Sequence, residues 1–257
     1  MRDLTVGLIQ SALAWEQPQQ NREHFETLIE HCGNNADLIV LPEMFTTGFS
    51  MQAAQQAESM DGTTCDWLRR LARAHDTAIA GSLPIAENGA VYNRLLFATP
   101  DGIQHYDKRH LFRMGNEHEH YKPGSARQVV NWRDWRINLQ VCYDLRFPVF
   151  SRNQNDYDVL LYVANWPARR AQHWRALLPA RAIENAAYVV AVNRIGDDGN
   201  SVAHSGDSLV IDPRGTTTLD MGSEAGVKTT VLDADALRQW RERFPVYKDA
   251  DRFEWST

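Results

Sequence analysis

The sequence predicts an α/β layered fold with a mixed sheet, and three observations carry this prediction. Short apolar runs rich in β-branched residues recur along the 257-residue chain. Near the N-terminus they alternate with segments whose apolar residues recur at helical spacing. In the middle, turn signals separate neighbouring runs as they do in β-hairpins. No linker or low-complexity tract divides the chain, so we expect a single domain over residues 1–257.

The first half of the chain contains elements of all three kinds. We expect strands at 4–9, 37–41, 77–80 and 91–98, and helices at 18–32 and from residue 63 or 64. Thr63 or Thr64 is expected to cap the second of these helices, because a hydroxyl accepts a hydrogen bond from a free backbone N–H. Asn88-Gly89 and Asp101-Gly102 favour hairpin turns on either side of the strand at 91–98.

The second half begins with a polar segment at 113–128 that we interpret as a loop. Strands are then expected at 136–142, 158–163, 188–193, 207–211, 216–219 and 227–232. A helix is expected at 170–187, and Asp233 is expected to cap a last helix that continues through Arg241.

Composition excludes several classes of protein. The formal net charge of −6 argues against a nucleic-acid binder, which would show a basic excess. No apolar run approaches the roughly 20 residues that span a bilayer. The N-terminus turns polar too soon for a signal peptide. Cys32, Cys65 and Cys142 are few and odd in number, which favours a reducing cytoplasm over a disulfide framework.

Three short segments hold candidate catalytic residues. Glu43 directly follows a predicted buried strand and a proline, where a side chain is held rigidly beside a cleft. Lys108 could place a positive charge beside a developing oxyanion. Cys142 ends a predicted strand, so its thiol is expected at a tip, followed by a turn whose backbone N–H could face a bound carbonyl oxygen. Each residue alone also has an ordinary structural explanation.

Common motifs of other enzyme classes are missing from the sequence. There is no Gly-x-Ser-x-Gly, no Gly-x-Gly-x-x-Gly, no phosphate-binding loop, no Cys-x-x-Cys and no His-Glu-x-x-His. The run Glu117-His118-Glu119-His120 offers zinc-ligand types, but side chains at i and i+2 diverge on a helix. A solvated polar loop is the simpler interpretation, and we expect no metal.

The order Glu43, Lys108, Cys142, together with Asn165-Trp166-Pro167 and the helix end at 181–185, resembles the nitrilase superfamily of carbon–nitrogen hydrolases. The resemblance covers residues from about 4 to about 233 and leaves 234–257 as a C-terminal extension. Within the superfamily, the stretch from Lys108 through Tyr121 resembles the bacterial omega-amidases.

The resemblance implies a four-layer α-β-β-α sandwich, a homodimer and chemistry without a cofactor. It also implies a Glu-Lys-Cys triad in which Cys142 attacks an amide carbon and Glu43 shuttles the proton. Lys108 and the backbone N–H of Tyr143 would hold the oxyanion, and a second glutamate would orient the triad. That glutamate could be Glu117 or Glu119; Glu117 fits the family spacing, six residues before Pro123-Gly124.

One position departs from the family pattern. The family often has an acidic residue after the proline of the cysteine segment, and Val149 stands there.

The substrate implied is an omega-amide of a dicarboxylic acid, especially 2-oxoglutaramate or 2-oxosuccinamate. Its distal carboxylate needs a cation, and arginine binds carboxylate bidentately. The candidates are Arg113, Arg146, Arg169 and Arg170, and the candidate pocket walls are Phe45 and Trp166. A nitrilase, an N-carbamoyl amide hydrolase and a non-catalytic binding protein of the same fold remain alternatives.

Overall fold

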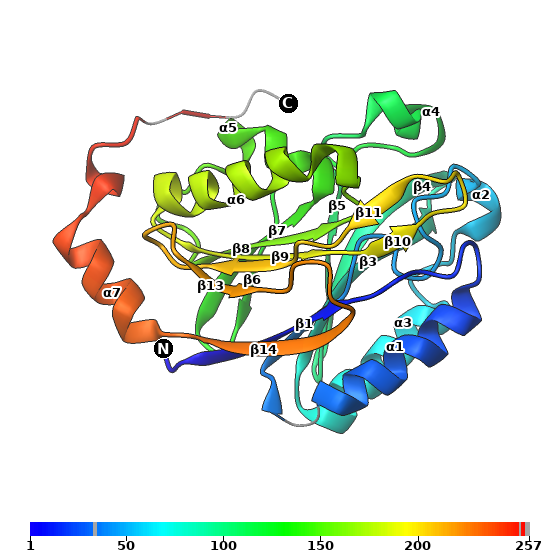
Figure 1. Cartoon of the computed structure of the whole chain (residues 1–257), viewed down its shortest axis with the longest axis horizontal. Coiled ribbons are helices and arrows are strands. Elements are labelled where there is room, and N and C mark those ends of the chain that lie inside the picture. Colours follow the sequence, from blue (N-terminus) through cyan, green and yellow to red (C-terminus); the bar gives the residue numbers. More distant parts are fainter. Residues whose placement is uncertain (33–34, 252, 255–257) are drawn as a thin grey trace.

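The computed structural model describes residues 1–32, 35–251, 253 and 254. These residues form two six-stranded mixed sheets, with helices on both outer faces (Figure 1). Helices α1 (Pro18–Cys32) and α3 (Thr63–His75) cover the first sheet, and α6 (Ala171–Asn185) covers the second. The fold is therefore the α-β-β-α sandwich that the resemblance implied.

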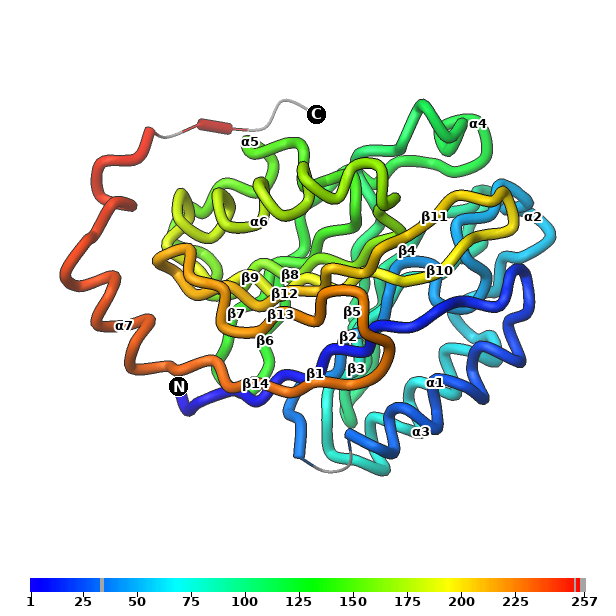
Figure 2. The backbone as a smooth tube through the Cα atoms, in the orientation of Figure 1, coloured from blue at the N-terminus to red at the C-terminus, as the bar shows by residue number. Residues whose placement is uncertain are grey.

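The first sheet joins both ends of the chain. Its strands, in spatial order, are β14 (Gly226–Leu232), β1 (Leu4–Gln10), β2 (Leu38–Val40), β3 (Ala78–Glu87), β4 (Ala90–Thr99) and β5 (Gly102–Asp107). β1, β2 and β3 are parallel, and the other pairs are antiparallel. Figure 2 shows β14 beside β1 although more than two hundred residues separate them.

The second sheet has a similar mixed order. Its strands are β13 (Thr217–Asp220), β12 (Leu209–Ile211), β9 (Tyr188–Asn193), β8 (Val159–Ala164), β7 (Trp135–Val141) and β6 (Val129–Trp132). β7, β8 and β9 are parallel at its centre. A separate hairpin of β10 (Ile195–Asp197) and β11 (Ala203–Ser205) extends from β9.

Alternate residues of each central strand enter different cores, which explains why these strands are apolar throughout. In β2, Leu38 and Val40 belong to the core that both sheets share. Ile39 and the following Leu41 belong to the core beneath α1 and α3. Burying apolar side chains on both faces contributes about 25 cal/mol per Å² removed from water.

Of the two helix caps predicted from the sequence, one is confirmed and one is wrong. Asp233 caps α7 (Ala234–Arg243), accepting a hydrogen bond from the Ala236 N–H at 2.8 Å, as expected. Thr63 and Thr64 do not cap α3, because both lie inside the helix and Gly62 is the cap residue. The Thr64 N–H is instead satisfied by the Glu58 carboxylate, which lies earlier in the chain (2.7 Å).

Across the described residues, no helix combines the length and the apolar character needed to cross a bilayer.

The segment at 113–128, predicted as a loop, contains two short helical turns. A 3-10 turn spans Arg113–Gly115 and α4 spans Glu117–His120. Other short helical elements of the described chain lie at α2 (Ala53–Gln56), α5 (Pro148–Ser151), and the 3-10 turns Cys142–Arg146, Ala168–Arg170 and Val246–Lys248. Three of these turns, Arg113–Gly115, Cys142–Arg146 and Ala168–Arg170, contribute residues to the walls of the site.

Candidate active site

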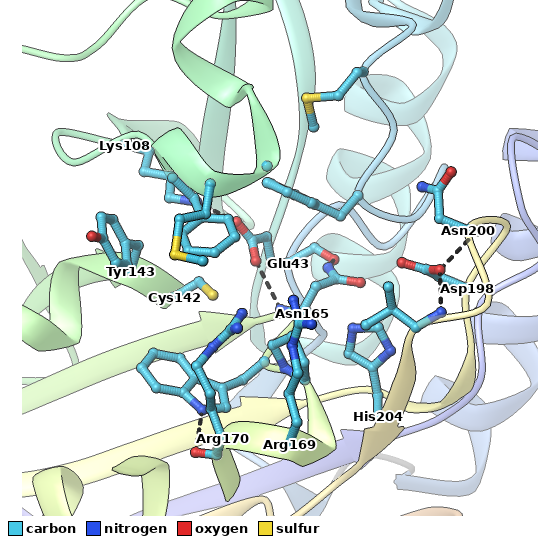
Figure 3. Close-up of a pocket in the computed structure, with 18 of the residues that line it drawn as sticks. Glu43, Lys108, Cys142, Tyr143, Asn165, Arg169, Arg170, Asp198, Asn200 and His204 are labelled. Carbon is cyan, nitrogen blue, oxygen red and sulfur yellow. Dashed lines mark hydrogen bonds and ion pairs between the residues drawn. The ribbon is translucent and has the colours of Figure 1, made fainter.

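The carboxyl ends of three strands bring reactive side chains together. Cys142 follows β7 directly, Asn165 follows β8 directly, and Glu43 stands shortly after β2. Lys108 is the first residue after β5, the edge strand of the first sheet. All four line one pocket (Figure 3). Residues at strand ends are held rigidly yet face a cleft, a placement that suits chemistry.

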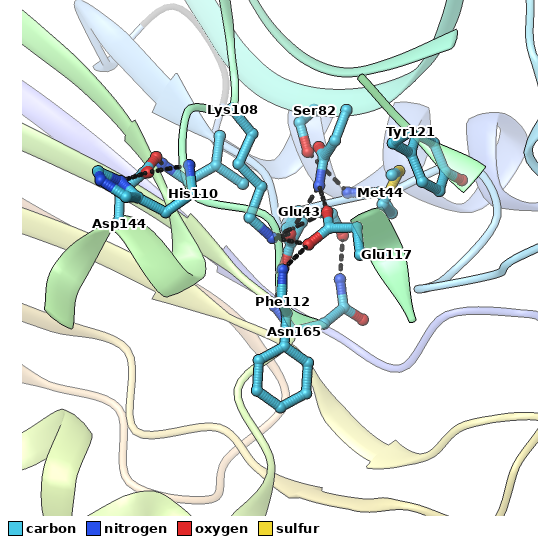
Figure 4. A network of polar contacts seen from close by, with 12 residues as sticks. Glu43, Met44, Ser82, Lys108, His110, Phe112, Glu117, Tyr121, Asp144 and Asn165 are labelled. Carbon is cyan, nitrogen blue, oxygen red and sulfur yellow. Dashed lines mark hydrogen bonds and ion pairs between the residues drawn. The ribbon is translucent and has the colours of Figure 1, made fainter. Parts of the chain in front are cut away.

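A buried ion-pair network surrounds Lys108 (Figure 4). Its ammonium donates to Glu43 Oε1 at 2.8 Å, and to Glu117 Oε1 and Oε2 at 3.0 and 2.9 Å. All three side chains are at most 1% exposed. Because charge-assisted hydrogen bonds between buried groups are strong and directional, this network fixes the position of the Glu43 carboxylate.

Two asparagines complete the hydrogen bonding of Glu43. Asn93, on β4, donates from Nδ2 to Glu43 Oε1 (2.8 Å) and to Glu117 Oε1 (3.0 Å). The Asn165 backbone N–H donates to Glu43 Oε2 (2.7 Å), and its side-chain amide donates to the Glu43 carbonyl. The Glu43 carboxylate is thus aligned from both sheets.

Cys142 stands in a strained backbone conformation. Its φ is +45°, in the left-handed region that non-glycine residues rarely adopt. Met44, next to Glu43, has a φ of +48° and is held by a bond from its N–H to Ser82 Oγ (2.9 Å). Such strain persists only where the surroundings over-determine the conformation, and it gathers at functional sites.

The buried carboxylate of Asp144 joins the Cys142 turn to the Lys108 loop. Its Oδ2 accepts from the Val141 N–H (2.9 Å) and from the Tyr106 hydroxyl (2.8 Å). Its Oδ1 accepts from the His110 N–H (3.0 Å). These bonds set the distance between the two segments that carry the thiol and the ammonium.

The Cys142 thiol is protonated in the resting site. Burial raises its pKa well above the ordinary value, and the adjacent Glu43 carboxylate acts in the same direction. Lys108 opposes this effect without cancelling it. Because the thiolate is the nucleophilic form, this cysteine needs a base at the moment of attack.

Burial and neighbouring charge have opposite effects on the pKa of Lys108, and again on the pKa of Glu117. Burial alone would lower the pKa of Lys108, but Glu117 and Glu43 outweigh it and the pKa is raised. Lys108 is therefore a permanent cation. Burial raises the pKa of the Glu117 carboxyl, and Lys108 partly counteracts that.

The pocket above these residues has a volume of about 180 Å³. Apolar side chains form much of its wall, namely Phe49, Met51, Phe112, Met114 and Trp166. Trp166 lies in the wall as expected, and its indole N–H donates to the Arg170 carbonyl (2.8 Å). Met114 is 81% exposed, so it belongs to the rim of the pocket.

Three of the four candidate arginines lie at this pocket: Arg146, Arg169 and Arg170. The Arg146 guanidinium lies 4.7 Å from the centre of the Trp166 ring, and that of Arg170 lies 5.1 Å from the centre of the Phe112 ring. Within the described part of the chain, none of the three arginines pairs with a carboxylate. Three guanidinium groups without an ion-pair partner among the described residues therefore lie at the pocket that holds Cys142, and the Asp198 carboxylate also lines it.

Phe45 and Arg113 lie elsewhere, contrary to the sequence analysis. The left-handed Met44 turns the chain so that Phe45 enters the core beneath the helices, with its ring 5.7 Å from that of Phe25 and 5.9 Å from that of Trp67. Arg113 is exposed and lines a separate groove with Arg109 and His118.

The run at 117–120 separates into one inward and several outward side chains. Glu117 is buried on Lys108, whereas Glu119 and His120 are exposed. Of the two glutamates considered, Glu117 is therefore the one that touches the triad. Nowhere in the described residues do three or more His, Cys, Asp or Glu side chains gather as metal ligands would.

Sequence reasoning missed Asn93 and Asp144 and gave Asn165 no role. It also missed one wall of the pocket, which the β10–β11 hairpin supplies with Asp198, Asn200, Val202 and His204. The available signals were a polar residue inside the apolar run at 91–98, and the position of Asn165 directly after a buried strand.

Together these groups can perform acyl transfer. Cys142 is a nucleophile beside a potential base, Glu43, and a fixed cation, Lys108. Tyr143 is the second residue of the 3-10 turn that starts at Cys142, where backbone N–H groups lack a partner within the turn. Its N–H and the Lys108 ammonium can serve as oxyanion donors.

The sequence matches a known protein family and named relatives. Residues 5–242 match the model of the carbon–nitrogen hydrolase family. The chain is 49% identical to the omega-amidase YafV of Yersinia enterocolitica, over 98% of this chain and 99% of that protein. It is 34% identical to the 2-oxoglutaramate amidase of Bacillus subtilis (strain 168), over 95% and 96% respectively.

A solved structure shares the fold closely. The protein XC1258 of Xanthomonas campestris, described as a CN-hydrolase superfamily protein with an arsenic adduct in its active site, has a TM-score of 0.98. It is 48% identical, with 100% of both chains covered.

Proposed function

The chain belongs to the carbon–nitrogen hydrolase family, and on that premise we propose that it is an omega-amidase. It hydrolyses omega-amides of dicarboxylic acids, such as 2-oxoglutaramate and 2-oxosuccinamate, to the acid and ammonia through a thioester on Cys142. The observation that carries this proposal is the group of unpaired arginines beside the buried Glu43–Lys108–Cys142 cluster. The names of the relatives, an omega-amidase and a 2-oxoglutaramate amidase, support the same substrate class.

Acylation follows from the resting protonation states. The neutral Cys142 thiol gives its proton to Glu43 as sulfur attacks the amide carbon. Lys108 and the Tyr143 N–H hold the oxyanion, and one such donor typically lowers the barrier by about 2.7–4 kcal/mol. Glu43 returns the proton to the amide nitrogen and the C–N bond breaks. Ammonia departs, and the acyl group remains on Cys142 as a thioester.

Deacylation uses the same residues in reverse order. Glu43 takes a proton from water as the water oxygen attacks the thioester carbon. The oxyanion again lies on Lys108 and the Tyr143 N–H. Collapse breaks the C–S bond, and the sulfur recovers the proton from Glu43. Glu117 keeps Lys108 in place through both halves, because it accepts two hydrogen bonds from the ammonium.

Arg170 is the candidate best placed to read the distal carboxylate of the substrate. Burial lowers its pKa, and the positive charges of Arg169 and Arg146 act in the same direction. Arg170 and Cys142 line the same pocket, which places Arg170 near the reacting centre. A bound carboxylate would relieve the repulsion among these cations and accept a bidentate hydrogen bond.

We expect Arg170→Ala to lower kcat/KM for glutaramate by about ten- to a hundredfold, since a hydrogen bond to a charged group contributes about 1.5–3 kcal/mol. The change should appear mainly in KM. An uncharged amide of equal length should be affected little. Arg113→Ala is the matched control, because Arg113 lies outside the pocket. If both variants affect both amides equally, Arg170 does not read the carboxylate.

Ammonia release from a panel of primary amides, nitriles and carbamoyl compounds tests the proposed function as a whole. Omega-amides with a distal carboxylate should be preferred over neutral amides, nitriles and carbamoyl compounds. Preference for a nitrile or a carbamoyl compound would assign the chain to another branch of the family. No turnover of any compound would favour a binding protein of the same fold.

The resemblance also implies a homodimer, and the cysteine count favours the cytoplasm. Both remain predictions, as does chemistry without a cofactor.

A further inference from the structure

Two buried carboxylates share one cation in the site. Glu43 and Glu117 are both fully buried, and Lys108 is the ammonium between them. An ammonium has three N–H donors. Lys108 directs one contact to Glu43 and two to Glu117. A pair of carboxylates held this closely by one cation favours protonation of one member unless neutral donors add further stabilisation.

Asn93 supplies such donors to both carboxylates at once. Its Nδ2 lies 2.8 Å from Glu43 Oε1 and 3.0 Å from Glu117 Oε1. Because ionised carboxylates only accept, both contacts fix Nδ2 as the donor. Asn93 is fully buried and is not among the residues that line the pocket, so it acts on substrate only through the two glutamates.

We propose that Asn93 is a positioning residue that keeps Glu43 and Glu117 ionised together, and so holds Glu43 ready as a base at neutral pH. This proposal rests on the proposed role of Glu43. The Asn93 carbonyl also accepts from the Lys108 N–H at 3.0 Å. That backbone bond survives a change of side chain, so a substitution tests the amide group alone.

The other groups around Glu43 and Glu117 do not take the place of Asn93 as a neutral donor to both carboxylates. The Cys142 thiol and the Tyr121 hydroxyl are neutral, because burial raises the pKa of both. The Phe112 N–H donates only to Glu117 (2.6 Å), and the Asn165 N–H only to Glu43 (2.7 Å). The remaining charged or titratable groups that line the pocket are Tyr143, the arginines at 146, 169 and 170, Asp198 and His204, and none of these side chains donates a hydrogen bond to either glutamate. Besides Lys108, only Asn93 therefore bridges both carboxylates within the described residues.

Loss of the Asn93 donor should shift the acidic limb of the pH profile, because Asn93 donates hydrogen bonds to both carboxylates. Donors to a carboxylate favour its ionised form and lower its pKa. Removing Asn93 Nδ2 takes one donor from each of the two carboxylates, so the doubly ionised pair is less stable and takes up a proton at higher pH than in the unaltered protein. Activity that requires both carboxylates to be ionised is lost as the pH falls, and in the variant this loss begins at higher pH. The acidic limb of the pH profile should therefore move to higher pH.

The experiment compares Asn93→Ala with the unaltered protein in two pH profiles. One is kcat/KM for the best amide substrate, and the other is the rate of Cys142 alkylation by iodoacetamide. Peptide mapping separates Cys142 from the two other cysteines, Cys32 and Cys65. We expect both acidic limbs to move up by about one to two pH units, since a hydrogen bond to a charged group typically accounts for a shift of this size.

Asn138→Ala is the matched control. Asn138 is equally buried, on β7, and its side chain accepts a hydrogen bond from Gln140 at 3.0 Å instead of contacting a carboxylate. Its removal should leave both acidic limbs in place. An Asn93→Ala profile that falls evenly at every pH, with an unmoved limb, would overturn the proposal.

Asn93→Ser keeps the proposal testable if the alanine variant does not fold. A serine hydroxyl donates one hydrogen bond, so it can serve only one carboxylate, and an upward shift of less than about one to two pH units relative to the unaltered protein is expected. An unshifted limb in this variant would also overturn the proposal. The alkylation profile needs no substrate, so it distinguishes failure of this inference from failure of the omega-amidase assignment.

Discussion

Replacing Cys142 with alanine should abolish ammonia release while the protein stays folded. Cys142 is the nucleophile of the proposed mechanism, and losing a nucleophile from a covalent mechanism costs about 10⁴-fold or more in kcat. The residue is 9% exposed and at the base of the pocket, so alanine removes little packing. The measurements are kcat for glutaramate and the thermal midpoint of unfolding.

Cys65→Ala is the control for this substitution. Cys65 is also a buried free cysteine, but it belongs to the core beneath α1 and α3. We expect this variant to retain kcat. Near-normal ammonia release from well-folded Cys142→Ala protein would show that another group attacks the amide.

Glu43→Gln should also inactivate the enzyme. Glutamine matches the shape of the side chain, but its amide cannot take the thiol proton. Loss of a general base typically costs about 10²–10⁴-fold. The effect should be evident because burial keeps the Cys142 thiol protonated, so attack depends on the base. Both kcat and the rate of thiol alkylation should fall.

Glu119→Gln serves as the control, because Glu119 is exposed although it lies in the same short helix, α4, as Glu117. It should leave kcat unchanged. If Glu43→Gln alkylated at the normal rate, Glu43 could not be the base that activates Cys142.

The central strands are predictable from the sequence because each packs apolar side chains into two cores, one on each face of its sheet. Leu38 through Leu41 are all apolar, and the structure explains this by alternation between the shared core and the helix-side core. The pairing of β14 with β1 has no local signal, since it joins segments from opposite ends of the chain. The β6–β7 hairpin also escaped prediction, because Arg133 and Asp134 adopt positive φ without the usual glycine.

The reactive side chains were predictable from sequence for a related reason. Glu43 and Cys142 each stand at the end of a predicted strand, and strand ends are where a rigid sheet presents side chains to a cleft. Lys108 is identified by its charge and by the resemblance of its segment to the family, and the structure places it directly after β5. The residues that align them were not predictable in this way. Asn93 lies within β4, and only the three-dimensional fold brings its amide to Glu43.

The errors at Phe45 and Arg113 have a common physical cause. Both were placed in the pocket because they stand close in sequence to a residue of the site. At Met44 a left-handed backbone turn reverses the direction of the next side chain, so Phe45 faces the helices. After Phe112 the chain turns outward, and Arg113 is exposed.

The thioester on Cys142 can be tested most directly by intact-protein mass spectrometry of samples quenched with acid during turnover of glutaramate. The mechanism predicts a transient species heavier than the free protein by the mass of glutaramate less ammonia. Peptide mapping should place the added acyl group on Cys142, and the species should be missing from Cys142→Ala. Ammonia release with no such adduct at any time, or with the adduct on a different residue, would contradict the mechanism.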